Sequence, residues 1–180
     1  MLSQTRKTPY PFGAIVELLI LTGQRRGETA SLRWEWIDEK AKTITLPSTI
    51  TKNKRAHTFP YGDMTAAVLA AVSRQSDYVF PAARVGVRGK PATIFNGWSK
   101  PKTAFDKACP IAPWTLHDLR RTFATNLAAL GVRLEVTEKL LNHVSGSFGG
   151  IVGIYQRHSF IDEMREAILA WEHRLEKLLA

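Results

Sequence analysis

The run FGAIVELLIL, from Phe12 to Leu21, constrains the fold of this chain more than any other segment. It is apolar around most of a helical circumference, which is typical of a helix that is buried on nearly all sides. Gly23 follows two residues later and can adopt the left-handed conformation that ends many helices. The rest of the chain must therefore supply elements that surround this helix.

The neighbouring patterns predict further helices and one small sheet. The segments 42–46 (KTITL) and 56–60 (AHTFP) alternate as strands do, and the charged turn TKNKR joins them into a hairpin. Helices are expected after Asp63, which can cap the first of them, and from Ile94 to Ala108. No internal repeat or low-complexity linker interrupts the chain, so we expect one domain over residues 1–180. Its predicted fold class is mainly α with a small antiparallel β-sheet (α+β).

The string WTLHDLRRTFAT marks a well-defined helix start. Thr115 is the expected N-cap, and Asp118 completes a capping box. An apolar stripe follows and Gly131 can end the helix; the stripe comprises Leu116, Leu119, Phe123, Leu127 and Leu130. Arg120 falls beside this stripe, with His117 further round the same helix start, where backbone N–H groups favour a phosphate. Taken alone, the motif favours a simpler interpretation, in which Arg120 pairs with Asp118 or another acid and His117 is solvated.

Five strings in a consistent order change that interpretation: TGQRRGE, TKNKR, LHDLRRTFAT, LNHVSG and IYQRH. They carry a series of basic residues followed by a tyrosine, namely Arg25, Lys52, His117, Arg120, His143 and Tyr155. Together, over roughly Tyr10 to His158, they resemble the catalytic domain of the tyrosine recombinases, in particular the phage-type integrases. The chain departs from the family at Asn142, where glycine is common, and in a long glycine-rich loop before Tyr155.

The resemblance implies a role for each of these residues. Tyr155 would attack the scissile phosphate and form a 3′-phosphotyrosine, while Lys52 protonates the departing 5′ oxygen as general acid. Arg25 and Arg120 would bind the phosphate and oppose the charge of the transition state. His117 and His143 would assist by hydrogen bonding and proton transfer, and Glu28 would orient Arg25. Glycines 146, 149, 150 and 153 would let the tyrosine segment move toward or away from the pocket.

Composition agrees with a polyanionic partner. The 25 Lys and Arg against 16 Asp and Glu give a net charge of +9, which favours a polyanionic partner through counterion release and is compatible with RNA, DNA or anionic lipid. Among these, the resemblance implies double-stranded DNA. The single cysteine, Cys109, fits a reducing compartment and argues against zinc. His117 and His143 have no metal-ligand spacing, so neither a metal nor a cofactor is expected. The sequence contains no membrane span or signal peptide, which predicts a protein of the bacterial cytoplasm.

Several alternatives stay open at this stage. A type IB topoisomerase would share the chemistry, and a non-catalytic DNA-binding module would share the basic pocket. The basic stretch 83–92 (ARVGVRGKPA) is equally consistent with a solvated loop and with a phosphate contact. The C-terminal apolar seam from Ile161 to Leu178 predicts a helix that packs either on its own domain or on a neighbour in a DNA-bound tetramer. Because the first motif lies near residue 1, we expect that N-terminal DNA-binding domains are absent from this chain.

Overall fold

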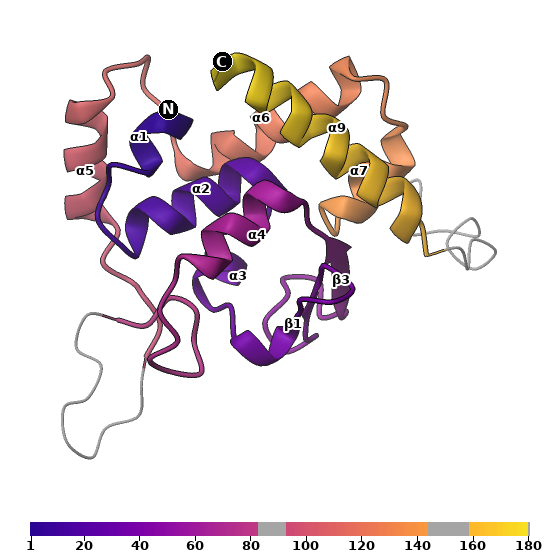
Figure 1. Cartoon of the computed structure of the whole chain (residues 1–180), viewed down its shortest axis with the longest axis horizontal. Coiled ribbons are helices and arrows are strands. Elements are labelled where there is room, and N and C mark those ends of the chain that lie inside the picture. Colours follow the sequence, from indigo (N-terminus) through magenta and orange to yellow (C-terminus); the bar gives the residue numbers. More distant parts are fainter. Residues whose placement is uncertain (83–92, 144–158, 180) are drawn as a thin grey trace.

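The computed structural model describes residues 1–82, 93–143 and 159–179, and Figure 1 shows their arrangement. They form a mainly helical domain with one small antiparallel sheet, as the sequence predicts. In chain order the elements are α1 (Leu2–Thr5), α2 (Phe12–Thr22), α3 (Arg26–Ala30), the 3₁₀ turn η1 (Trp34–Trp36), β1 (Ile37–Asp38), β2 (Thr43–Leu46), β3 (His57–Pro60), α4 (Asp63–Ala70), α5 (Ser99–Ala108), α6 (Leu116–Ala129), α7 (Leu134–Leu140) and α9 (Ile161–Leu179).

Helix α2 lies at the centre of the molecule, in contact with α1, α3, α4, α6 and α9 (Figure 1). Its side chains Ile15, Val16 and Leu21 are completely buried, which confirms the prediction of a helix enclosed on nearly all sides. The helix ends at Gly23, whose φ of 63° is left-handed. A Cβ at this position would lie 2.5 Å from the ring of Phe123 on α6, so glycine is required for both conformation and space.

The sheet is antiparallel with the strand order β1-β2-β3. Ile44 pairs with Phe59 and both are buried, whereas the exposed Thr45 faces Thr58 on the outer side. This alternation confirms the predicted hairpin. The sequence does not predict strand β1, because its 2 residues are too few to show the alternation of buried and exposed side chains that is typical of a strand.

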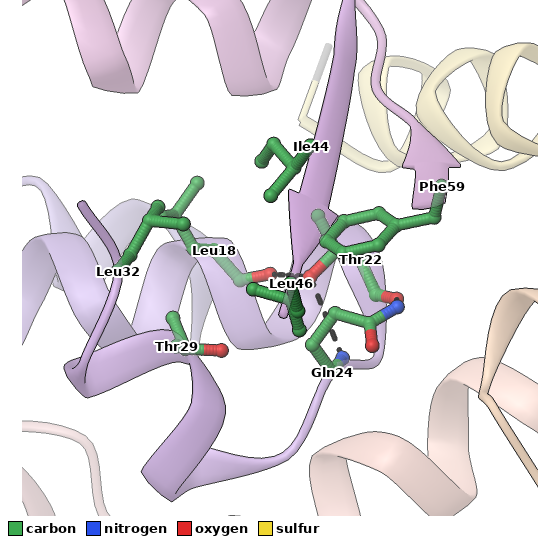
Figure 2. A pocket seen from close by; sticks show the side chains of 8 residues that line it. All are labelled: Leu18, Thr22, Gln24, Thr29, Leu32, Ile44, Leu46 and Phe59. Atoms are coloured by element: carbon green, nitrogen blue, oxygen red, sulfur yellow. Dashed lines mark hydrogen bonds between the residues drawn. The ribbon is translucent and has the colours of Figure 1, made fainter. Parts of the chain in front are cut away.

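A small interior gap separates α2 and α3 from this sheet. Figure 2 shows that Leu18, Ile44 and Phe59 are among the side chains lining it, with Gln24 at one edge. Its volume of about 10 Å³ is far below the several hundred Å³ of a ligand pocket. The gap is therefore a packing feature of the core rather than a binding site.

Helix α6 begins and ends as predicted. Thr115 is the N-cap, and the Asp118 carboxylate accepts hydrogen bonds from its backbone N–H at 2.8 Å and its hydroxyl at 2.7 Å. Gly131 follows the last turn with a φ of 79°. Leu119, Phe123 and Leu127 are buried in the core. The capping box and the stripe are thus confirmed.

Three local predictions need correction. The helix expected from Ile94 begins at Ser99, because Ile94 forms a β-bridge with Pro81 instead. The sequence also predicts a helix that starts near Arg25 and carries Ala30, Leu32 and Trp34, but α3 ends already at Ala30. Asp63 does not cap α4: it is the first helical residue, and the backbone N–H groups of that turn are bound from elsewhere. The basic stretch 83–92 lies outside the described residues.

The turn at the start of α4 is capped by α9, from the other end of the chain. Glu172 accepts hydrogen bonds from the N–H groups of Met64 at 3.1 Å and Thr65 at 3.3 Å. Trp171, its neighbour on α9, packs edge-on against Phe123 and donates to the carbonyl of Ile20 at 3.0 Å.

Helix α9 therefore packs on its own domain, the first of the two interpretations of the C-terminal seam. The buried face of the helix comprises Met164, Ala167, Ile168, Trp171, Glu172 and Leu175. The seam does not extend to its last turn, where Leu178 is 71% exposed. Among the described helices, none combines the length and the apolar composition that crossing a bilayer requires.

Candidate functional site

Arg25 stands where the chain enters helix α3. Its backbone is extended at the N-cap position, with ψ of 140°. Nη1 donates to Glu28 Oε1 at 3.2 Å, and Nη2 donates to the carbonyl of Asn142 at 3.3 Å. The predicted contact between Glu28 and Arg25 is therefore present, and the guanidinium is held from two sides.

Arg120 is buried on the inner side of α6, with only 7% of its surface exposed. Nη1 donates to the carbonyl of Gly23 at 3.0 Å, and Nη2 donates to the carbonyl of Leu141. Burial, together with the smaller effect of the nearby charge of Arg25, lowers the pKa of this guanidinium to about 10. Arg120 thus stays protonated near pH 7.

The simpler interpretation of the HDLR motif is wrong for Arg120. Asp118 binds the neighbouring side chain instead, at 3.0 Å from Arg121 Nη1. Hydrogen bonds from Thr115 lower the pKa of the Asp118 carboxyl, so it is ionised as a cap rather than as a partner of Arg120. Arg120 is left with neutral carbonyls, and its charge is available to an anion.

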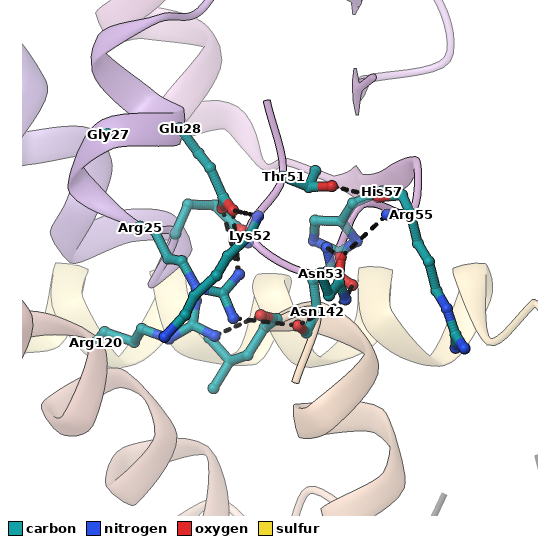
Figure 3. A network of polar contacts seen from close by, with 12 residues as sticks. Arg25, Gly27, Glu28, Thr51, Lys52, Asn53, Arg55, His57, Arg120 and Asn142 are labelled. Atoms are coloured by element: carbon teal, nitrogen blue, oxygen red, sulfur yellow. Dashed lines mark hydrogen bonds and ion pairs between the residues drawn. The ribbon is translucent and has the colours of Figure 1, made fainter. Parts of the chain in front are cut away.

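Lys52 lies in the hairpin turn between β2 and β3. Its backbone N–H donates to Glu28 Oε1 at 3.3 Å, so the same carboxylate that holds Arg25 also holds the turn. The side chain of Lys52 is exposed and points toward Arg120 (Figure 3). Glu28 itself is 4% exposed and joins the two basic residues from below the surface.

An open pocket of about 680 Å³ collects four of the predicted residues, Arg25, Lys52, His117 and Arg120. Its other charged lining residues among those the structure describes are Arg26 and Lys102, and none of the described lining residues is acidic. The helix start of α6 adds its positive dipole end. The pocket is therefore built for an anion such as a phosphate.

Aromatic side chains hold the two additional cations at the rim of the pocket. Arg26 stacks on the ring of Trp98 at 5.0 Å from the ring centre, and Lys102 lies 4.0 Å from that of Trp114. Sequence reasoning missed these contacts, because the partners come from different parts of the chain. Both rings stabilise a cationic side chain that lines the pocket, and Lys102 is also paired with Asp106 at 2.6 Å.

Of the remaining two predicted residues, only His143 lies in the described part of the chain. His143 does not line the pocket: it is exposed at the end of α7, with Nδ1 3.6 Å from Glu138 Oε1. It nevertheless follows Asn142, whose carbonyl binds Arg25. Tyr155 and glycines 146, 149, 150 and 153 lie outside the described residues.

His57 is a residue of the site that the sequence did not reveal. It is buried, with Nε2 3.0 Å from the carbonyl of Leu140. Its pKa is lowered to about 4, mainly by burial and also by the charges of Arg120 and Arg25, against the opposing effect of the hydrogen bond to Leu140. The imidazole is therefore neutral at pH 7 and donates to Leu140. Its place on an inward-facing strand position was the one available signal.

The end of α7 is thus the common anchor of the site. The carbonyl of Leu140 accepts from His57 and from Gln24 Nε2 at 2.8 Å, that of Leu141 from Arg120, and that of Asn142 from Arg25. These carbonyls carry the negative end of the helix dipole, which favours cations and donors. In the described part of the chain, no group of three or more His, Cys, Asp or Glu side chains could hold a metal ion.

The chain is similar in sequence to known proteins. A model of the phage integrase family matches residues 2–160. The prophage integrase IntZ of Escherichia coli (strain K12) is 30% identical over 169 residues, which cover 92% of this chain and 40% of that protein. The chain thus spans less than half the length of this curated relative.

Two solved structures share the fold. The XerA recombinase superposes with a TM-score of 0.63 at 24% identity, covering 96% of this chain and 60% of that one. The XerH site-specific recombinase bound to its difH substrate superposes with a TM-score of 0.61 at 16% identity, covering 80% of this chain and 45% of that one. The mainly helical architecture with a small antiparallel sheet is therefore that of recombinase catalytic domains.

Proposed function

Since the chain belongs to the phage integrase family, we propose that it is the catalytic domain of a site-specific tyrosine recombinase that cuts and rejoins double-stranded DNA. The observation that supports this most directly is the pocket that brings Arg25, Lys52, His117 and Arg120 together without an acidic side chain among its described lining residues. The XerH protein of the same fold is a site-specific recombinase bound to its difH substrate, which agrees with the proposed reaction.

In the proposed reaction, the scissile phosphate lies between the guanidinium groups of Arg25 and Arg120. Each group has N–H donors beyond those used by the carbonyls and by Glu28, so each can bind non-bridging oxygens. The phosphate would thereby be fixed, and the charge that develops on it would be opposed.

The hydroxyl of Tyr155 attacks the phosphorus and loses its proton. The bond from phosphorus to the 5′ oxygen breaks, the 3′ side becomes attached to the tyrosine, and Lys52 gives a proton to the departing oxygen. His117, at the pocket wall, and His143 would assist these proton transfers. Attack by a 5′ hydroxyl reverses the step, so rejoining needs neither ATP nor a metal ion.

We further propose that the domain works in a tetramer on DNA, in the cytoplasm of a bacterial host. Two DNA duplexes exchange strands in such recombination, so several active sites must meet. The net charge of +9 would bring the domain to DNA by phosphate contacts that carry little sequence information.

The decisive experiment replaces the nucleophile. We expect Tyr155→Phe to abolish the covalent protein–DNA product on a nicked substrate while leaving DNA affinity almost unchanged, since the hydroxyl reacts but contributes little to binding. A denaturing gel resolves the product. Tyr10→Phe, which removes a hydroxyl that lies outside the pocket and donates to the carbonyl of Val79 at 2.5 Å, is the matched control and should keep the product.

A covalent band that survives in Tyr155→Phe would exclude this residue as nucleophile. Relaxation of supercoiled plasmid without strand exchange between two sites would instead favour a type IB topoisomerase. Binding of DNA with no covalent product from the unaltered chain would favour a non-catalytic module.

A further inference from the structure

The residue at the end of helix α7, Asn142, has a backbone conformation that glycine usually supplies. Its φ is 47°, in the left-handed region. The N–H of His143 donates to the carbonyl of Glu138 at 2.9 Å, and that of Asn142 donates to Lys139 at 3.0 Å. These two bonds define the Schellman motif, in which glycine is most frequent and asparagine is tolerated. The helix end alone does not require a side chain here.

The side chain of Asn142 has a partner 89 residues away in the sequence. Asn53 Nδ2 donates to Asn142 Oδ1 at 2.6 Å, and Asn142 Nδ2 donates to Asn53 Oδ1 at 3.2 Å. Each amide thus donates to and accepts from the other, as Figure 3 shows. We call this contact the amide pair. A glycine at position 142 could not form it.

Asn53 directly follows Lys52 in the hairpin turn. The turn is closed by the hydroxyl of Thr51, which donates to the carbonyl of Arg55 at 2.7 Å, and Asn53 Oδ1 also accepts from the N–H of Arg55 at 3.3 Å. The amide pair therefore joins an ordered turn to the end of α7, and Lys52 lies at the junction.

Lys52 is consequently held between two anchors that both lead to Arg25. On one side its backbone N–H binds Glu28, which binds Arg25 Nη1. On the other side Asn53 binds Asn142, whose carbonyl binds Arg25 Nη2. A closed ring of contacts thus sets the position of Lys52 relative to Arg25.

We propose that Asn53 and Asn142 are positioning residues that place the ammonium group of Lys52 at the departing 5′ oxygen. The inference rests on the proposed function. Both amide side chains are partly exposed, so water can replace their mutual hydrogen bonds with little loss of global stability. What water cannot replace is the fixed position of the turn, on which a proton transfer to the leaving group depends.

The test compares two nicked DNA substrates that differ in one atom. In the first, the leaving group is the natural 5′ oxygen; in the second, it is a 5′-bridging sulfur, which leaves as a thiolate and needs no proton from Lys52. The principal variant is Asn142→Gly, since glycine keeps the left-handed helix end and removes the amide. The rate of covalent product is measured for both substrates.

We expect Asn142→Gly to slow the reaction of the oxygen substrate by roughly tenfold or more, since small displacements of a catalytic group have effects of this size. The sulfur substrate should react at nearly the unaltered rate. Asn53→Ala should slow the oxygen substrate at least as much, because besides the amide pair it removes the acceptor for the Arg55 N–H at 3.3 Å and the donor to the Asn142 carbonyl at 3.4 Å. The double variant should be no slower than Asn53→Ala, because Asn142→Gly breaks no further contact of the turn.

Asn126→Ala is the matched control. This asparagine lies on α6, where its amide donates to the carbonyl of Thr122 at 2.8 Å and has no part in the turn. It should react like the unaltered chain with both substrates. Thermal unfolding of each variant checks that the fold is kept.

Two outcomes would overturn the inference while leaving the proposed function intact. In the first, Asn142→Gly slows the reaction of both substrates equally. In the second, it slows the reaction of neither substrate. Both outcomes require that the unaltered chain reacts with both substrates. If the unaltered chain forms no covalent product with either substrate, the proposed function fails and the inference fails with it.

Discussion

Two buried charged side chains of this protein bind to helix ends, with opposite signs. Arg120 donates to a carbonyl at the C-terminal end of α7, and Glu172 accepts from two N–H groups at the N-terminal end of α4. Both arrangements follow from the helix dipole, which favours a cation at one end and an anion at the other. The two regions differ in whether the charged group also faces an open pocket.

Around Arg120 the structure leaves an opening. The guanidinium is one wall of the basic pocket, next to Arg25, and its charge can act on a ligand. Around Glu172 there is no such opening: the carboxylate lies against Gly62, where even a single added carbon would be 2.1 Å from Oε2. The same interaction therefore supports binding in one region and only connects elements of the fold in the other.

The largest effect should come from the open region. We expect Arg120→Ala to slow covalent cleavage by roughly 10² or more, the range found when a donor to a transition-state charge is removed. The matched control is Arg165→Ala, which removes an arginine on α9 that also donates to a backbone carbonyl, that of Ala41 at 3.1 Å. Equal rates for the two variants would show that Arg120 is a structural residue like Glu172.

The second prediction concerns the pH dependence of the free energy of unfolding. His57, beside the basic pocket, and Glu172, at the start of α4, should contribute to it with opposite signs. The folded-state pKa of His57 is lowered to about 4 from 6.5, so its stabilising effect is present above pH 6.5 and is lost as pH falls toward 4. For Glu172, burial raises the carboxyl pKa, so its contribution is greatest in acid and declines as pH rises through the raised pKa.

His57 should therefore account for about 3 kcal/mol of the free energy of unfolding between pH 7 and pH 4, from a lowering of its pKa by about 2.5 units. In His57→Gln, which keeps a donor for Leu140 but does not titrate, this part of the pH dependence should disappear. Denaturant titrations at several pH values measure it. An unchanged slope would contradict a buried neutral imidazole.

In the closed region, removal of the carboxylate should affect stability alone. We expect Glu172→Ala to lower the free energy of unfolding by about 2 kcal/mol, since it leaves the first turn of α4 without its acceptor. Cleavage measured well below the melting temperature should be unchanged. Glu166→Ala, an exposed position on the same helix, should alter stability by less than about 0.5 kcal/mol. A loss of cleavage in folded Glu172→Ala would remove the distinction between the two regions.

The smallest effect tests how tightly the closed region is packed. We expect Gly62→Ala to destabilise the protein by about 1 kcal/mol, because its Cβ would displace the Glu172 carboxylate. In a Glu172→Ala background the same change should have almost no effect. A double-mutant cycle by thermal unfolding gives the coupling between the two positions. Additive effects would show that the carboxylate can move aside freely.

Features of the molecule that depend on neighbouring residues were predictable from the sequence. The capping box of Thr115 and Asp118, the helix-ending glycines 23 and 131 and the β2–β3 hairpin all depend on contacts within a few residues. The choice of Arg25, Lys52, His117 and Arg120 came from motif order, and the structure places these four in one pocket.

The tertiary structure decided which distant groups complete these local elements. Asp63 is adjacent to the start of α4 and looked like its cap, yet the cap comes from Glu172, 107 residues or more from the N–H groups it binds. Likewise Asn142 pairs with Asn53, and His57 reaches Leu140. The local sequence shows where a helix begins and ends, and therefore which backbone groups need a hydrogen-bond partner. The partner itself is whichever polar group lies within about 3 Å after folding, and that depends on the packing of the whole chain.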